Sequence, residues 1–337
     1  MDKFTRMLAE QGFILADGAT GTNYFALGLE TGHPPEFWNI EKPENVSGLH
    51  RRFLEAGADL ILTNSFGGTS YRLKLHAAEG RVRELNIAAA KLAREAVTAF
   101  EENTGRTALV AGSMGPTGEL FAPLGALDHE SAVAAFTEQA EALAEGGVDL
   151  LWIETISSLE EVDAAMDAAK SVGLPFTATM TFDTAGKSMM GVEPGDYARH
   201  VHQGGAVAAG ANCGVGPAEL MHSVMGMREI DGIRLIAKGN CGIPEYRDGE
   251  IHYHGSPELM AKYATLARDA GMAVIGGCCG TTPEHIAAMR QALDSTPPQG
   301  PVDQARLDHE LGPAWAGTAD QKEGRSGRDG RRGRRRR

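Results

Sequence analysis

The sequence predicts an α/β fold in which eight parallel strands close into a single (β/α)8 barrel, also called a TIM barrel. The first observation is that short apolar runs alternate with amphipathic helical patterns eight times along the chain. The second is that glycines precede several of these runs, as is typical of loops that lead from a helix into a strand. The third is the length of 337 residues, which one such barrel commonly fills. The eight predicted strands are Phe13–Asp17, Asp59–Asn64, Ala108–Gly112, Asp149–Glu154, Phe176–Thr181, Val207–Cys213, Arg234–Gly239 and Met272–Gly277.

Helix signals stand between the predicted strands. Ser158 followed by Glu161 predicts a helix start with a capping box, and Thr282 before Pro283 predicts another start. The alternative fold is a doubly wound open sheet, which usually carries a G-x-G-x-x-G phosphate loop after its first strand. The segment "DGATGT" (17–22) does not match that loop, so the pattern favours the closed barrel.

The chain divides into a predicted barrel over residues 1–297, a C-terminal extension over 298–324 and a basic tail over 325–337. The formal net charge is -13, but the tail holds eight arginines and one aspartate, so it carries +7. The rest holds 24 basic and 44 acidic residues and carries -20, which argues against nucleic acid as the main partner. The low-complexity tail is expected to be disordered. It is interpreted as a solubility or self-association arm, or as a contact for RNA or an acidic partner, and a homo-oligomer stays open.

The compartment is expected to be the cytoplasm. The amino terminus has no apolar segment of the kind that a signal peptide needs, and no stretch is apolar enough to span a membrane. In a reducing compartment, cysteines at suggestive positions point to metal binding or catalysis rather than to disulfides.

Chemically active side chains gather at the carboxyl ends of the predicted strands, where barrel enzymes place their catalytic groups. These residues are Asp17, Thr63, Asn64, Ser113, Glu154, Thr181, Cys213, Asn240, Cys278 and Cys279. Three of the four cysteines are among them. The ends of parallel strands share one rim, so we expect these side chains to face a common site.

The cysteines suggest a metal centre. Cys278 and Cys279 end the last strand and Cys213 ends the sixth, so three thiolates converge on one rim. Three protein ligands with an open fourth position are typical of catalytic zinc. A role for Cys241 as a fourth ligand, which would make the site structural, stays open, as does the reading of all four as ordinary thiols. We expect one zinc ion per chain, held by Cys213, Cys278 and Cys279.

A zinc ion in such a site would favour a soft incoming ligand, and a substrate thiol fits best. Bound to zinc, a thiol loses its proton at neutral pH, although a free thiol has a pKa of about 8.5. The natural reaction is attack by that sulfur on an activated carbon, such as an onium methyl group.

Four segments together resemble the homocysteine S-methyltransferase family: "DGATGT" (17–22), "TNSFGG" (63–68), "GANCG" (210–214) and "GGCCG" (276–280). The similarity covers roughly residues 10 to 295, and the chain looks most similar to the bacterial betaine–homocysteine methyltransferases, including their arginine-rich end. The resemblance implies a zinc-dependent barrel that methylates homocysteine to methionine, with Cys213, Cys278 and Cys279 as metal ligands.

The resemblance also implies residues for the amino acid part of homocysteine. Asp17 and Glu154 are the predicted catalytic residues and would hold the ammonium group, with Thr63 and Asn64 beside it. The backbone amides from Gly18 onward could bind the carboxylate. For Asp17 a simple turn-forming Asp-Gly pair is the alternative.

The methyl donor is expected to be glycine betaine, which would give dimethylglycine as the second product. A quaternary ammonium group is usually held by aromatic faces. Trp38 is the first candidate and Phe66 the second, with Tyr24, Phe25 and Tyr71 as further aromatics.

Other functions stay open at this point. "DGATGT" and "TNSFG" also resemble methionine synthases and S-methylmethionine-using enzymes, so S-methylmethionine or dimethylsulfoniopropionate are alternative donors. A zinc-stabilised thiol-binding or interaction protein, whose basic tail contacts RNA or a partner, is the alternative outside enzymes.

Overall fold

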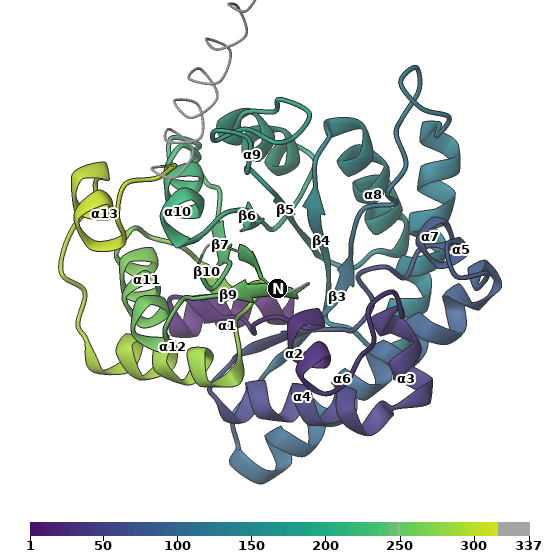
Figure 1. Ribbon diagram of the computed structural model, residues 1–337, viewed down its shortest axis with the longest axis horizontal. Coiled ribbons are helices and arrows are strands. Elements are labelled where there is room, and N and C mark those ends of the chain that lie inside the picture. Colours follow the sequence, from purple (N-terminus) through teal and green to yellow (C-terminus); the bar gives the residue numbers. More distant parts are fainter. Residues whose placement is uncertain (243, 248–249, 316–337) are drawn as a thin grey trace, which may run out of the picture.

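Eight parallel strands form the main sheet of the protein, as the sequence predicts (Figure 1). The computed structural model describes residues 1–242, 244–247 and 250–315. The strand order is β1-β10-β7-β6-β5-β4-β3-β2. A parallel bridge between Ala16 and Leu60 brings the two edge strands together, and the Asp59 N–H donates to the Leu15 carbonyl at 2.7 Å. The sheet thereby curves into a barrel. The strands are β1 (Ile14–Leu15), β2 (Leu60–Leu62), β3 (Leu109–Met114), β4 (Leu150–Ile156), β5 (Phe176–Met180), β6 (Ala208–Cys213), β7 (Leu235–Gly239) and β10 (Val274–Gly277).

Helices follow each strand and surround the barrel. The main outer helices are α4 (Pro43–Glu55), α6 (Val82–Thr104), α7 (His129–Gly146), α8 (Leu159–Val172), α9 (Pro194–Gln203), α10 (Pro217–Met225), α11 (Pro257–Asp269) and α12 (Pro283–Ser295). Shorter elements lie in the loops: α2 (Gly21–Ala26), η1 (Pro35–Phe37), α3 (Trp38–Glu41), α5 (Ser70–Lys74), η2 (Glu79–Arg81) and the hairpin β8 (Pro244–Arg247) with β9 (Glu250–Tyr253). Helix α13 (Gln304–Leu311) belongs to the predicted extension and packs against α10 and α11.

Each predicted strand overlaps an observed one, but β3 and β4 each run two residues further than predicted. Ser113 and Glu154 therefore lie inside strands rather than at their last residues. These two polar side chains satisfy each other, since the Ser113 hydroxyl donates to Glu154 Oε1 at 2.5 Å. A buried hydrogen-bonded pair lets the strand continue past polar residues, which a hydropathy pattern cannot reveal.

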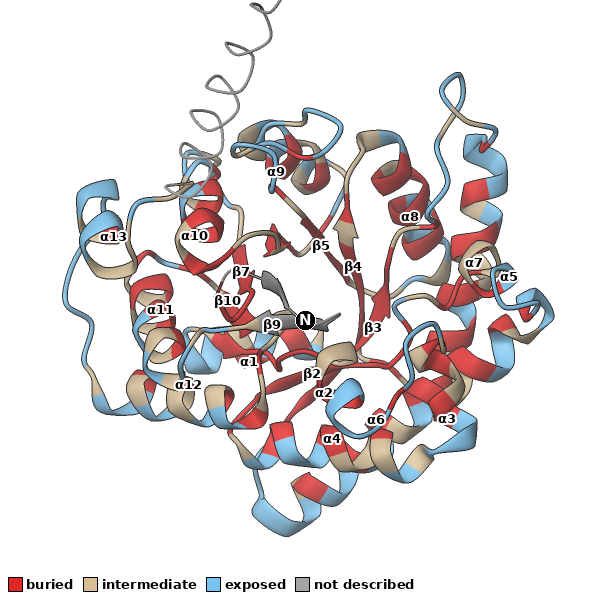
Figure 2. Cartoon of the chain, viewed as in Figure 1, coloured by how far each residue is buried: buried red, intermediate tan, exposed pale blue. Residues whose placement is uncertain are grey.

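Helix α1 (Lys3–Gln11) closes the amino-terminal end of the barrel. Its Phe4 and Met7 are buried in one apolar cluster with the first residues of several strands, including Ile14, Leu150 and Val274. In Figure 1 this helix lies across one end of the barrel, and Figure 2 shows the buried strands around it. A second and larger cluster fills the layer between the strands and the outer helices. With one end filled by side chains, the carboxyl ends of the strands are the open end of the barrel.

The predicted capping box at α8 is only half formed. Ser158 Oγ accepts from the Glu161 N–H at 3.2 Å, as predicted. The Glu161 carboxylate does not return to Ser158. It accepts from the N–H and the hydroxyl of Thr117, at 2.8 and 2.6 Å. Glu161 therefore ties α8 to the loop after β3, a long-range contact that outweighs the local one. At the predicted start of α12, Thr282 forms a capping box with His285.

His50 on α4 gives a prediction about pH and stability. Its ring is buried and its Nε2 has no hydrogen-bond partner in the described part of the chain. Burial lowers the pKa of His50 to about 4. The folded state holds the ring neutral, whereas the unfolded chain takes up a proton below about pH 6.5. The folded state is therefore fully stable with respect to this group above about pH 6.5, and it loses free energy of unfolding as the pH falls towards 4. Between pH 8 and pH 5 this costs about 2 kcal/mol of unfolding free energy.

Urea unfolding of the wild type and of His50→Gln at both pH values measures this contribution. The variant, which cannot titrate at this position, should lose about 2 kcal/mol less than the wild type on acidification. Equal losses in the two proteins would show that His50 is not the group responsible.

The structure describes only part of the two predicted C-terminal segments. The 298–324 extension is described as far as Trp315, and the 325–337 tail lies outside the described residues. Among the helices that are described, none combines the length and the apolar character needed to cross a membrane.

Candidate active site at the carboxyl ends of the strands

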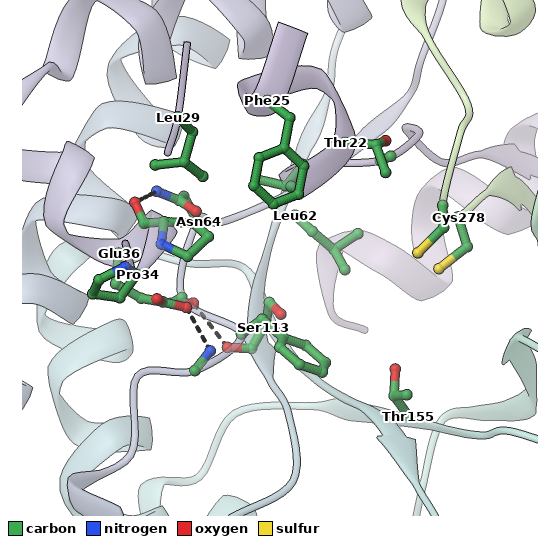
Figure 3. A pocket seen from close by; sticks show the side chains of 18 of the residues that line it. Thr22, Phe25, Leu29, Pro34, Glu36, Leu62, Asn64, Ser113, Thr155 and Cys278 are labelled. Atoms are coloured by element: carbon green, nitrogen blue, oxygen red, sulfur yellow. Dashed lines mark hydrogen bonds between the residues drawn. The ribbon is translucent and has the colours of Figure 1, made fainter. Parts of the chain in front are cut away.

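A cavity of about 1140 Å³ opens at the carboxyl ends of the strands. Most of the predicted site residues line it: Gly18, Thr63, Asn64, Phe66, Ser113, Glu154, Cys213, Cys278 and Cys279. Figure 3 shows Ser113, Thr155 and Cys278 around this space, with Glu36 and Pro34 on the side away from Cys278. Six of the residues that the sequence suggested for the site do not line the cavity: Asp17, Tyr24, Trp38, Tyr71, Thr181 and Asn240.

The three predicted ligand cysteines meet at one place. The Sγ atoms of Cys213, Cys278 and Cys279 all lie within 4.8 Å of one another, and those of Cys213 and Cys279 are 3.9 Å apart. A tetrahedral zinc ion with bonds of about 2.3 Å separates its sulfur ligands by about 3.8 Å. The donor set and its spacing therefore fit a zinc ion, and all three cysteines line the cavity.

Cys241 is not part of this group. Its side chain is buried and its thiol donates to the Gly255 carbonyl at 3.0 Å. Among the described residues it belongs to no cluster that could hold a metal. The geometry thus favours a group of three cysteines over a group of four.

The backbone around Cys213 is shaped for this position. Cys213 has a φ of 61°, a left-handed conformation that non-glycine residues rarely adopt, and Gly214 follows with a φ of 80°. Such strain persists only where the surroundings hold it, and it concentrates at functional sites. Asn240, which is buried, provides one such hold. It donates to the Gly214 carbonyl at 2.6 Å and accepts from the Cys279 N–H at 3.0 Å, so one side chain ties both ligand segments together.

The thiols share hydrogen bonds and differ in acidity. Hydrogen bonds donated by Cys213 and Cys278 lower the pKa of Cys279 to about 3. The pKa of Cys213 is raised, first by its hydrogen bonds to Cys278 and Cys279 and then by burial. The group is therefore able to carry negative charge near neutral pH, as metal ligands must.

Lys238 is a site residue that the sequence analysis missed. Its Nζ lies at the floor of the cavity, 3.3 Å from Asp17 Oδ1, and donates to the Gly277 carbonyl at 2.6 Å. Burial would lower the pKa of Lys238, but the charges of Asp17, Cys278 and Glu154 raise it above its usual value. The ammonium group therefore stays charged and balances the acidic groups around it. The sequence feature that could have identified Lys238 is its place inside the apolar run "LIAKG" (235–239), where an aliphatic residue is expected.

Asp17 lies below the cavity rather than in its wall. Its side chain is 2% exposed, and its Oδ2 accepts from the Leu62 N–H at 2.8 Å. Burial raises its pKa, and Lys238 opposes that shift. Asp17 thus supports Lys238 and the end of β2, and Glu154 is the predicted carboxylate that faces the cavity.

Glu154 is poised to accept or donate a proton near neutral pH. Burial raises its pKa to about 7, opposed by Lys238 and by the Ser113 hydrogen bond and reinforced by Cys278. Thr63 and Asn64 already have protein partners. The Thr63 hydroxyl bonds Ser65 Oγ at 2.6 Å, and the Asn64 amide donates to the Pro35 carbonyl at 2.7 Å.

The structure places Trp38 in the core instead of the cavity. It is 3% exposed and packs against Tyr24 with the ring centroids 5.2 Å apart. The helical turn at 35–41 points it inward, because it is the largest apolar side chain of that segment. The aromatic side chains that do line the cavity in the described chain, histidines aside, are Phe25, Phe66 and Tyr253.

Comparisons with known proteins place this barrel among relatives. A model of the family described as homocysteine S-methyltransferase matches residues 14–293. The methionine synthase of Mycobacterium leprae is 30% identical over 313 residues, which is 86% of this chain but only 25% of that longer protein. The metallated form of the homocysteine methyltransferase MmuM from Escherichia coli superimposes with a TM-score of 0.71 at 25% identity, covering 85% of this chain and 98% of that one.

A more distant likeness concerns the fold alone. A rubisco-like protein from Burkholderia fungorum covers 90% of this chain with a TM-score of 0.52 at 13% identity. The family model, by contrast, spans both ligand segments and nearly the whole barrel. The chain therefore belongs to the homocysteine S-methyltransferase family.

Proposed function

We propose that the protein transfers a methyl group from a cationic onium donor to the sulfur of homocysteine, giving methionine, with the help of one zinc ion. The observation that carries the proposal is the convergence of Cys213, Cys278 and Cys279 within 4.8 Å at the open end of the barrel. Family membership supports homocysteine as the acceptor, and the similarity to a metallated MmuM supports a bound metal.

The three cysteines would hold the zinc ion. A zinc ion with three thiolate ligands offers its remaining position to a soft sulfur ligand and favours the thiolate form of that sulfur. Asn240 keeps the two ligand segments in register, and Lys238 offsets part of their negative charge. These residues prepare the site before either substrate binds, which is a large part of how such enzymes accelerate reactions.

Glu154 is the proposed partner for the ammonium group of homocysteine. It is a buried carboxylate in the cavity wall, and the charges of Lys238 and Cys278 both act on its pKa. Asp17 would act indirectly, by holding Lys238 in position. The amides of Gly18 and Thr20 remain proposed sites for the carboxylate, whereas the Ala19 N–H already donates to the Thr281 carbonyl at 3.0 Å.

Glycine betaine is the donor proposed first, with dimethylglycine as the product, and dimethylsulfoniopropionate and S-methylmethionine are the alternatives. All three carry a methyl group on a positively charged nitrogen or sulfur. Phe25 and Phe66 line the cavity and offer aromatic faces to such a cation. Phe66 therefore remains a proposed donor contact, and Trp38 does not, since it lies in the core.

A donor panel combined with metal analysis tests the proposal. We expect the purified protein to contain about one zinc ion per chain, as in other three-ligand catalytic sites. With homocysteine present, at least one of the three onium donors should yield methionine. Absence of methionine from every donor with zinc-loaded protein would refute the proposed reaction, and full turnover in zinc-free protein would refute the role of the metal.

A further inference from the structure

The cavity is larger than homocysteine alone requires. Its volume of about 1140 Å³ exceeds the roughly 300–1,000 Å³ of pockets that hold one drug-sized ligand. The thiols lie on the side of β6 and β10, whereas another part of the wall carries Phe66 and Arg72 from the segment after β2, together with Glu36 from η1. In Figure 3 Glu36 lies across the drawn space from Cys278, with Phe25 and Leu62 between them. The cavity thus has a thiol end and a second, charged end.

Arg72 at this second end has unused hydrogen-bond donors. It lies on α5, a short helix that Thr69 caps and that the buried Leu73 anchors. A guanidinium group offers five N–H donors, yet that of Arg72 makes no hydrogen bond or ion pair with any residue in the described ranges. Gly118 leaves room for it, because a Cβ at that position would lie 3.0 Å from Arg72 Nη1.

Other arginines beside buried carboxylates in this protein behave differently. Arg94 pairs with Asp149 at 2.5 Å, and Arg290 pairs with Asp59. The charge of Arg72 acts on the buried carboxylate of Glu36, but Glu36 already accepts a hydrogen bond from the Gly67 N–H at 2.6 Å. Burial raises the pKa of Glu36 and the charge of Arg72 opposes that shift, but the two side chains form no ion pair within 4.0 Å. Arg72 therefore keeps its donors for something else that enters the cavity.

We propose that Arg72 binds the carboxylate of the methyl donor and so directs its onium group towards the thiol end. This inference rests on the proposed function. Glycine betaine, dimethylsulfoniopropionate and S-methylmethionine all have a carboxylate besides the onium group. A planar guanidinium binds a carboxylate through two parallel charge-assisted hydrogen bonds. Phe25 and Leu62, which lie between Glu36 and Cys278 in Figure 3, then offer apolar side chains along which the onium methyl groups can lie.

The carboxylate does not change during methyl transfer, so this contact should act on binding and not on the chemical step. Replacing Arg72 by methionine is expected to raise the KM for the carboxylated donor about 10- to 100-fold. The kcat value, the KM for homocysteine and the zinc content should stay as in the wild type. Arg72→Lys, which keeps the charge but loses the paired hydrogen bonds, should fall in between.

The test compares two donors that differ in the carboxylate: dimethylsulfoniopropionate and trimethylsulfonium. The wild type should prefer dimethylsulfoniopropionate in kcat/KM, and Arg72→Met should lose that preference because only the carboxylated donor is affected. Lys74→Met serves as the control. It removes a positive charge from an exposed position of the same helix, and it should keep the preference.

The outcomes separate the two proposals. If the wild type methylates homocysteine but Arg72→Met keeps its preference, or loses activity equally with both donors, then Arg72 does not bind the carboxylate. If the wild type uses no onium donor, including betaine and S-methylmethionine, the proposed function fails and the donor subsite fails with it.

Discussion

Replacing Cys213 by serine is expected to abolish both zinc binding and methyl transfer. The substitution removes one of three thiolates, and a serine hydroxyl is not deprotonated at neutral pH, so the site can no longer hold a soft ion tightly. Removing a residue that supports a metal ligand typically lowers activity by about 10- to 100-fold. Removing a ligand itself should have a larger effect, and we expect turnover to fall by about 1,000-fold or more. Zinc content by elemental analysis and methionine formation from homocysteine measure the two effects on the same protein sample.

Cys241→Ser is the matched control for this experiment. Cys241 lies close to the same rim, but its thiol bonds the Gly255 carbonyl and belongs to no metal-binding group among the described residues. A serine hydroxyl can replace that hydrogen bond, so zinc content and turnover should be retained. Full activity of a zinc-free Cys213→Ser protein would overturn the metal-based mechanism.

Replacing Lys238 by methionine should have the second largest effect, and it should act on stability as well as on the site. Lys238 is 3% exposed and is the buried cation next to Asp17, which is 2% exposed. Methionine has a similar length, so the main change is that Asp17 and Glu154 lose a neighbouring positive charge. Breaking a buried ion pair by removing one partner costs about 3–5 kcal/mol. The Gly277 carbonyl also loses its donor, so the zinc affinity should fall by about 10- to 100-fold.

A double-mutant cycle with Asp17→Asn separates the ion pair from a general packing defect. Because the double variant removes both charges, it should recover part of the unfolding free energy that Lys238→Met loses. Urea unfolding gives the stabilities and competition with a zinc chelator gives the affinities. Strictly additive losses in the two single variants would mean that the two side chains are not coupled.

Much of the barrel could be predicted from the sequence, because its strands are apolar on both faces and stand between clear helix signals. Each of the eight predicted runs overlaps an observed strand, and six of them contain it entirely. The exceptions involve contacts between residues distant in sequence. β3 and β4 continue past their predicted ends because Ser113 and Glu154 bond each other, and Glu161 leaves its capping box for Thr117. Neither partner can be found by inspecting a local window.

The candidate site could be predicted because the carboxyl ends of all the parallel strands lie at the same end of a barrel. The positions of the strand ends alone predict that Cys213 lies close to Cys278 and Cys279, as it does in the structure. The direction in which a side chain points was harder to foresee. Trp38 lies on a helical turn whose inward face is set by packing against Tyr24, and Lys238 and Asp17 face each other under the floor of the cavity. Charge pairs of this kind leave no pattern in sequence spacing.

The separation of the sulfur atoms along the chain sets the order of events during synthesis. Cys213 ends β6, while Cys278 and Cys279 follow β10, with β7 and α11 made in between. A growing polypeptide that has not reached residue 278 possesses a single member of the trio and cannot form the three-thiolate site. The metal site proposed above can therefore form only after the final strand has been synthesised and has joined the sheet. An ion bound by all three thiols would in this way mark a completed barrel.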